Sequence, residues 1–107
     1  MRSRLNQLIE WHQEDPSDSF IRFAMASEYV KLGELESGRQ HFESLRESDP
    51  SYVGLYYHLG KLLERLERIE EAVSVYRDGI GIATRLKDLH ARSELQSALL
   101  EAEMGEW

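Results

Sequence analysis

The side chains that could carry acid–base or metal chemistry are spread along the whole chain. Its four histidines are His12, His41, His58 and His90. No two of them are four residues apart and no His-Glu-x-x-His motif occurs, so the spacing that places two metal ligands on one helix face is missing. We therefore expect no metal site, and we interpret each histidine as a surface or half-buried helix residue.

The carboxylates and the paired glycines do not indicate catalysis either. Glu70, Glu71, Glu101 and Glu103 have the spacing of solvated helix faces, whereas general acid–base catalysis needs a carboxyl group removed from water. Gly79-Ile80-Gly81 lacks both the preceding strand and the following Lys-Ser/Thr of a phosphate-binding loop. Within a helical pattern, these glycines predict close helix packing instead. We expect no catalytic residue and no cofactor, and hence no enzyme.

The composition narrows the class of protein further. The chain has 107 residues, no cysteine, and 13 basic against 20 acidic side chains, for a formal net charge of −7. This length predicts one domain, and the missing cysteine excludes a disulfide framework. The negative charge argues against a nucleic-acid partner, which would need a basic surface. No stretch approaches the roughly 20 apolar residues of a membrane-spanning helix, and no apolar run follows the basic N-terminus. We therefore expect no membrane partner, no signal peptide and a cytoplasmic protein.

One tripeptide occurs twice and reveals an internal repeat. Asp15-Pro16-Ser17 returns as Asp49-Pro50-Ser51, at an offset of 34 residues. At the same offset the residue classes agree in the pairs Ile21/Leu55, Phe23/Tyr57, Met25/Leu59, Ala26/Gly60, Gly38/Ala72 and Phe42/Tyr76. Large, small and aromatic residues thus recur in register, which two copies of one packing unit require.

The elements that carry these residues are expected to be helices. Apolar residues recur every three or four positions, and no sustained alternation or hairpin signal indicates a strand. We predict helices at residues 3–14, 17–32, 35–48, 51–66, 69–85 and 88–103. Ser17 or Asp18, and later Asp88, are expected to cap helices. Gly33 is expected to close one in the left-handed conformation, and Leu66-Glu67-Arg68 makes a less comfortable turn in the second copy.

The second copy resembles a tetratricopeptide repeat, whose pattern is W-x2-L-G-x2-Y, then A-x3-F, then P. It has Tyr56-x2-Leu59-Gly60-x2-Leu63, followed by Ala72-x3-Tyr76. The first copy is looser and reads Arg22-x2-Met25-Ala26-x2-Tyr29, Gly38-x3-Phe42 and Pro50. The resemblance implies an all-α fold, namely a right-handed stack of antiparallel helix pairs, or α-solenoid, of about six helices.

The repeat boundaries predict how the chain is organised. We expect a single domain over 1–107, with repeat 1 at 17–50 and repeat 2 at 51–85. The helix at 3–14 would be a capping half-repeat that closes the front through Leu5, Leu8, Ile9 and Trp11. The helix at 88–103 would close the back through Leu89, Leu95, Leu99 and Leu100. Two positions depart from the family pattern: Arg22 stands in the large aromatic slot, and Thr84 replaces the last proline, so that helix should run on. Residues 104–107, with Trp107, are expected to be a frayed end.

The resemblance also implies a function and a binding face. Tetratricopeptide arrays are known mainly as protein-interaction scaffolds, and the first helices of their units line a groove for a peptide or a partner helix. The matching positions here are Phe20, Phe23, Ser27, Val30, Lys31, Tyr57, Lys61, Glu64 and Arg65. Lys31, Lys61 and Arg65 make this face basic, which favours an acidic peptide or a free C-terminal carboxylate as the ligand. We therefore expect the partner to be another protein or an acidic peptide. The alternative is that these three are ordinary solvated charges.

Two further alternatives remain open at this stage. The aromatic residues Phe23 and Tyr57 either pack between helices or expose part of their rings as binding hot spots. The protein itself is either an interaction scaffold or a structural homo-oligomer that uses Leu95, Leu99 and Leu100 as an interface between copies.

Overall fold

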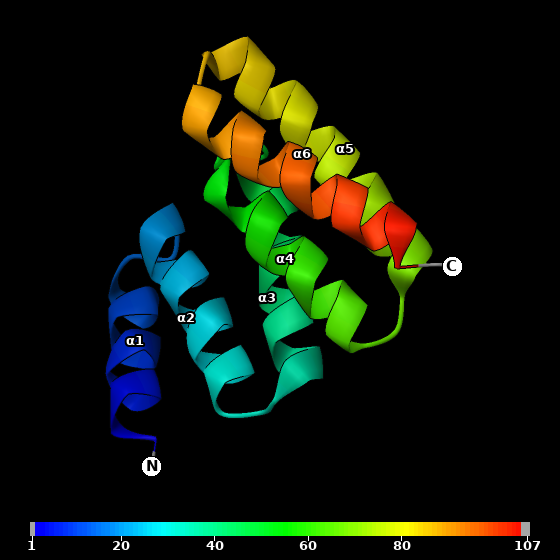
Figure 1. Cartoon of the computed structure of the whole chain (residues 1–107). Helices are drawn as coiled ribbons and strands as arrows, with labels where there is room; N and C mark the ends of the chain where they lie inside the picture. Colours follow the sequence, from blue (N-terminus) through cyan, green and yellow to red (C-terminus); the bar gives the residue numbers. More distant parts are fainter. Residues whose placement is uncertain (1, 106–107) are drawn as a thin grey trace. The chain divides into compact units, whose positions relative to one another are not determined.

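The computed structural model describes residues 2–105, and these form six α-helices and no strand (Figure 1). The helices are α1 (Ser3–Glu14), α2 (Ser19–Lys31), α3 (Leu35–Ser48), α4 (Gly54–Arg65), α5 (Ile69–Leu86) and α6 (Leu89–Met104). The predicted all-α class is confirmed. The described chain divides into two compact units, unit 1 up to Tyr52 and unit 2 from Val53. The assignment to a single domain stays a prediction.

The helix ends follow the expected signals, with later starts for α2 and α4. Asp18 caps α2 by accepting a hydrogen bond from the backbone N–H of Ile21 at 3.0 Å, and Asp88 caps α6 in the same way. Gly33 has φ of +84°, and Glu67 must adopt φ of +59° at the matching turn of unit 2. The left-handed conformation disfavours a side chain, so the less comfortable second turn is confirmed. Without a proline, α5 continues to Leu86.

Unit 1 consists of α1, α2 and α3. The helices α2 and α3 run antiparallel, and α1 packs against α2 (Figure 1). The core consists of Leu5, Leu8, Met25, Ala26, Phe42 and Leu45. The small residue at Gly38 allows α3 to approach α2, since a Cβ atom there would lie 2.7 Å from a methyl group of Val30. The predicted close approach at this position is confirmed.

Arg22, which replaces the expected aromatic residue, links all three helices of unit 1. Its guanidinium donates a hydrogen bond to the hydroxyl of Ser44 at 2.7 Å and lies 3.2 Å from Nε2 of His12. Nδ1 of His12 is buried without a hydrogen-bond partner. Burial, and then the charge of Arg22, lower the pKa of His12 below its ordinary 6.5. The contact between Arg22 and His12 is therefore favourable only while His12 is neutral.

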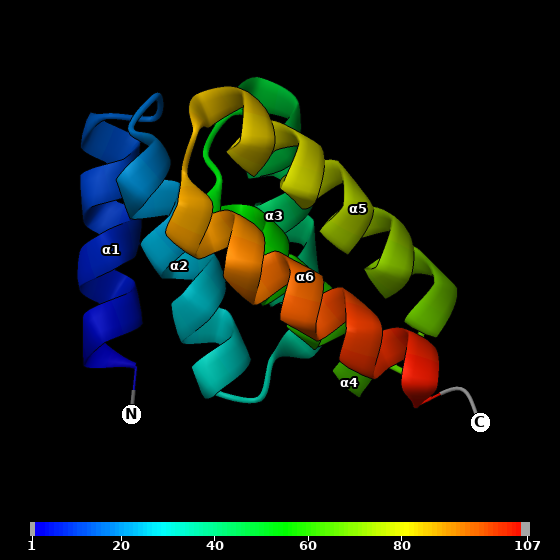
Figure 2. The same ribbon diagram turned by 45° about the horizontal axis from the view of Figure 1, so that its top comes forward.

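Unit 2 consists of α4, α5 and α6, and α5 packs against both of the others. Figure 2 shows α6 beside α5, with the two helices running in opposite directions. A Cβ atom at Gly60 would lie 2.1 Å from the ring of Tyr76, and one at Gly79 would lie 2.5 Å from Cβ of Tyr56. These contacts confirm close packing at both glycines. Gly81 is exposed and has no such neighbour, so the packing role predicted for it is wrong.

The inner face of α6 differs in part from the prediction. Leu95, Ala98 and Ala102 are buried, whereas Leu89 is 71% and Leu100 58% exposed. A helix turns about 100° per residue, so Leu100 lies about 140° around the axis from Leu95. The roles of Leu89 and Leu100 in closing the back of the unit are therefore wrong. Met104 belongs to α6, while Trp107 lies outside the described residues.

In α1 of unit 1, Leu5 and Leu8 are buried as predicted, whereas Trp11 is 43% exposed.

Among the described residues, no helix is both long enough and apolar enough to cross a membrane.

The two glycines of α5 should respond in opposite ways to alanine. We expect Gly81→Ala to raise the free energy of unfolding by about 1 kcal/mol, because an exposed helical glycine costs that much relative to alanine. Gly79→Ala should lower it by about 1–3 kcal/mol, because its new methyl group would meet Cβ of Tyr56, an atom fixed to the backbone. Urea unfolding followed by circular dichroism measures both. Equal effects of the two substitutions on the free energy of unfolding would contradict the packing of Gly79 against Tyr56 and the open space at Gly81.

Acid should destabilise the chain through His12. Its pKa is lowered in the folded state, so protonation favours the unfolded state, and stability should fall as the pH drops below about 6.5. Burial also lowers the pKa of neighbouring His41, which adds in the same direction. We expect His12→Gln to reduce the loss of melting temperature between pH 8 and pH 5. His90→Gln is the control, because His90 is exposed. An unchanged pH dependence in His12→Gln would show that this contact is not the sensitive one.

Candidate functional site

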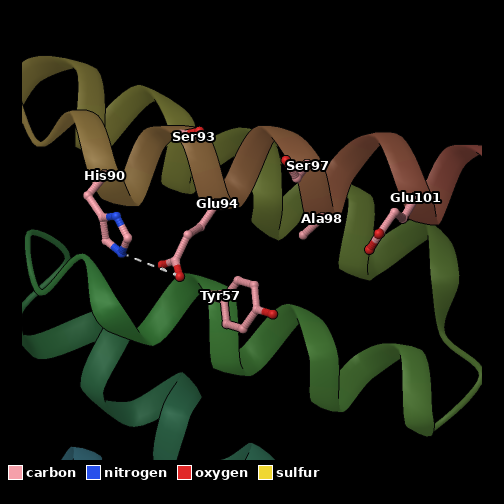
Figure 3. Close-up of a pocket in the computed structure, with 7 residues that line it drawn as sticks. All are labelled: Tyr57, His90, Ser93, Glu94, Ser97, Ala98 and Glu101. Atoms are coloured by element: carbon pink, nitrogen blue, oxygen red, sulfur yellow. Dashed lines mark ion pairs between the residues drawn. The ribbon is translucent and has the colours of Figure 1, made fainter.

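Unit 2 contains a groove between α4 and α6. A hollow of about 330 Å³ is lined by Tyr57 from α4 and by His90, Ser93, Glu94, Ser97, Ala98 and Glu101 from α6. In Figure 3, Tyr57 extends from α4 toward α6, while His90, Glu94 and Glu101 extend from α6 toward α4. A second hollow of about 300 Å³ shares Tyr57 and Glu94 with the first. Tyr57 and Glu94 therefore stand at the centre of one continuous groove.

The contributions of the two helices follow from their spacing. On α6, His90, Glu94, Ser97 and Glu101 lie three or four residues apart, and so they form one stripe. On α4, Tyr57, Lys61 and Glu64 have the same spacing and form the opposite stripe. The buried residues Leu95, Ala98 and Ala102 hold α6 in this rotation. The packing of α6 thus decides which of its side chains reach the groove.

Carboxylates outnumber ammonium groups in the groove. The Lys61 ammonium lies 3.9 Å from a carboxylate oxygen of Glu64 and 3.8 Å from one of Glu101. It also lies 5.7 Å from the centre of the Tyr57 ring, within the range of a cation–π contact. Glu94 lies 3.5 Å from His90, whose ring is charged only when protonated. The groove therefore carries net negative charge around Tyr57.

Glu64 also has a partner in the core. It accepts a hydrogen bond from the hydroxyl of Tyr76, which is otherwise fully buried. Burial, and then this bond, raise the pKa of Tyr76 well above its ordinary value. The bond connects α4 to the packing of α5, so Glu64 is held in position beside Lys61.

The structure gives the residues expected to line a groove on unit 1 different roles. Phe20 is 63% exposed and Lys31 is exposed. Phe23 is half-buried and contacts the rings of Phe42 and Tyr52, with centroids 5.9 and 5.4 Å apart. Ser27 has a buried hydroxyl, and Val30 packs against α3 at Gly38. Phe20 and Lys31 are therefore the members of this set that a ligand could reach most easily.

In unit 2 the sequence found only one side of the groove. Tyr57 lines both hollows, whereas Lys61 and Glu64 line neither. Lys61 contacts Glu101 of α6, and Arg65 is exposed one helical turn beyond Lys61. Sequence reasoning missed Glu94, Ser97 and Glu101, since α6 was treated only as a closing helix. Their spacing of three and four residues indicated that they share one face of a helix. The sequence around them did not show that this face is turned toward α4.

The groove offers groups that can bind a ligand. Within residues 2–105, no group of three or more His, Asp or Glu side chains is placed to hold a metal ion. His58, at the edge of the second hollow, has a pKa lowered mainly by burial, although the charge of Glu94 opposes this. An aromatic ring flanked by carboxylates and serine hydroxyls is suited to holding a ligand by contact and charge.

Taken together, the helix–turn–helix pairs and the groove define a small all-α repeat protein. The tetratricopeptide repeat profile matches residues 53–85. A tetratricopeptide repeat domain protein from Salinibacter ruber, known from a crystal structure, is 46% identical in sequence to this chain. The match covers 80% of this chain and 97% of the Salinibacter ruber chain, with a TM-score of 0.77. The chain therefore belongs to the tetratricopeptide repeat family. No curated protein matches it.

Two more distant structures share the fold. PcrH, in complex with the chaperone binding region of PopD, is 12% identical, covers 96% of this chain and 78% of its own, and has a TM-score of 0.88. The TPR2B domain of yeast Sti1, in complex with pHsp70, is 14% identical, covers 94% of this chain and 81% of its own, and has a TM-score of 0.88. At these identities the likeness shows the fold alone.

Proposed function

We propose that this chain is a non-enzymatic scaffold that binds another protein through the first helices of its repeats. The observation that carries the proposal is the groove between α4 and α6, with Tyr57 at its centre. Two proteins of the same fold, PcrH and the TPR2B domain of Sti1, are described in complex with a protein segment or pHsp70. These complexes support a peptide or a helix as the kind of ligand. The cytoplasmic location stays a prediction.

Each unit has its own proposed binding residues, which are those named from the sequence and, in unit 2, also the α6 stripe. In unit 1 they are led by Phe20 and Lys31, which are exposed. In unit 2 they are led by Tyr57, whose ring is half-buried beside the hollows. The sequence favoured an acidic ligand because three cations, Lys31, Lys61 and Arg65, were expected on the binding face. In the structure, the charge of Lys61 is already paired with the carboxylates of Glu64 and Glu101. An acidic ligand of unit 2 would therefore depend mainly on Arg65, and one of unit 1 on Lys31.

The groove proposal is tested by affinity capture with quantitative mass spectrometry. We expect Tyr57→Ala to reduce recovery of the specific partner by about tenfold or more, since a central aromatic residue of an interface commonly contributes more than 1.4 kcal/mol. Arg85→Ala is the matched control, because Arg85 is exposed on α5 and lines neither hollow. Thermal melting of both variants shows that they are folded. Equal recovery of every partner by the wild type and Tyr57→Ala would remove the groove from the proposal.

Self-association is a second candidate, supported by the exposed apolar residues of α6. Leu89, Leu100 and Met104 are all more than half exposed, and apolar surface of this kind favours contact between proteins. Leu95, which the sequence assigned to such an interface, is buried within unit 2 and is not available for it.

Light scattering across a concentration series tests self-association. If α6 joins two copies, the mass should rise with concentration, and Leu100→Glu should return the chain to a monomer by placing a charge in the interface. Ser74→Glu, at an exposed position of α5, is the control. A constant monomer mass at high concentration would exclude this candidate.

A further inference from the structure

The groove in unit 2 has a specific chemical character around Tyr57. Two hollows, of about 330 and 300 Å³, meet at Tyr57 and Glu94. The wall on the α6 side carries Ser93, Ser97 and two carboxylates, and the floor includes the small residue Ala98. The space is large enough for one long side chain of a ligand, and it is lined by an aromatic ring, hydroxyl acceptors and negative charge.

The charged groups of this face do not balance. The carboxylates are those of Glu64, Glu94 and Glu101, and Lys61 is the ammonium group that lies among them. Lys61 contacts Glu64 and Glu101, whereas the neighbours of Glu94 are two histidines: His90 at 3.5 Å, and His58, whose pKa is lowered mainly by burial although the charge of Glu94 opposes this. Arg65 lies farther along α4, two helical turns beyond Tyr57. Glu94 is about half exposed, so its charge remains accessible to a ligand.

The contacts of Lys61 indicate which kind of ligand group this face can bind. Its ammonium is near both the Tyr57 ring and the Glu101 carboxylate, at 5.7 and 3.8 Å. A cation therefore fits here between an aromatic ring and an acid. Glu94, which lines both hollows beside Tyr57, offers the same combination without a lysine of this chain to occupy it.

We infer that the α4–α6 groove of unit 2 binds a basic segment of a partner protein, with an arginine side chain placed between Tyr57 and Glu94. Arginine suits the site better than lysine, because its planar group stacks on an aromatic ring and pairs with a carboxylate at the same time. The hydroxyls of Ser93 and Ser97 are available to accept its remaining hydrogen bonds. This inference rests on the proposed function and names the chemistry of its ligand, opposite in charge to the one favoured by the sequence.

The experiment begins with an unbiased choice of ligand. A random peptide library displayed on phage is selected on the full chain at low ionic strength, and the most enriched peptides are synthesised with a fluorescent label. Their Kd is measured by fluorescence anisotropy on the wild type, on Glu94→Gln and on Glu70→Gln. Glu70 is an exposed carboxylate in the first turn of α5 and lines neither hollow, so Glu70→Gln makes the same change of charge away from the groove.

We expect the enriched peptides to be rich in arginine and poor in acidic residues. Glu94→Gln should weaken their binding by about threefold or more, Glu70→Gln should leave it unchanged, and added salt should weaken it further. Enrichment of acidic peptides would overturn the inference while leaving the protein-binding function in place. Basic peptides bound equally well by Glu94→Gln and the wild type would overturn the site. Failure to enrich any peptide would count against the proposed function itself.

Discussion

In both units, helices come together at positions where a side chain is missing and a neighbour occupies the space. The ring of Tyr76 lies against Gly60, the Cβ atom of Tyr56 lies against Gly79, and Val30 lies against Gly38. Because a Cβ atom at any of these glycines would come within 3 Å of its neighbour, the helices could not keep their present separation if the glycines were replaced. The distance between paired helices, and with it the position of every residue on the groove, depends on these contacts.

The groove depends on the same packing in a more direct way. Tyr76 reaches through the space above Gly60 and donates its hydroxyl hydrogen to Glu64, so a core residue of α5 positions a charged residue of α4. One turn further along the same face of α5, Gly79 is close enough for a Cβ atom to lie 3.0 Å from Leu95, and this contact with α6 fixes the rotation of α6. The polar stripe of α6 faces α4 as a consequence. Burial of apolar residues in α5 thus decides where the charges of two other helices meet.

The sequence was sufficient to predict the helices, because the repeat and the apolar spacing are local properties. It also indicated which small residues permit close packing, as at Gly38 and Gly60. The exposure of Gly81 could not be predicted from the sequence, because a glycine that packs against another helix, such as Gly79, looks the same in sequence as one that faces solvent. The contact between Lys61 and Glu101 could not be predicted from the sequence either. Glu101 is 40 residues away in the sequence, and its proximity follows from the rotation of α6, which only the three-dimensional packing decides.

Comparison of equivalent positions shows how one repeat pattern accommodates different chemistry. Unit 2 combines the large residue Tyr56 with Gly79, and at the same offset of 34 unit 1 combines Arg22 with Leu45. Leu45 is fully buried in the core of unit 1. Arg22 extends toward Ser44 and His12, and the contact among three helices becomes polar. The stability of unit 1 thereby becomes linked to the protonation of a histidine, whereas that of unit 2 depends on the fit of a ring against a glycine.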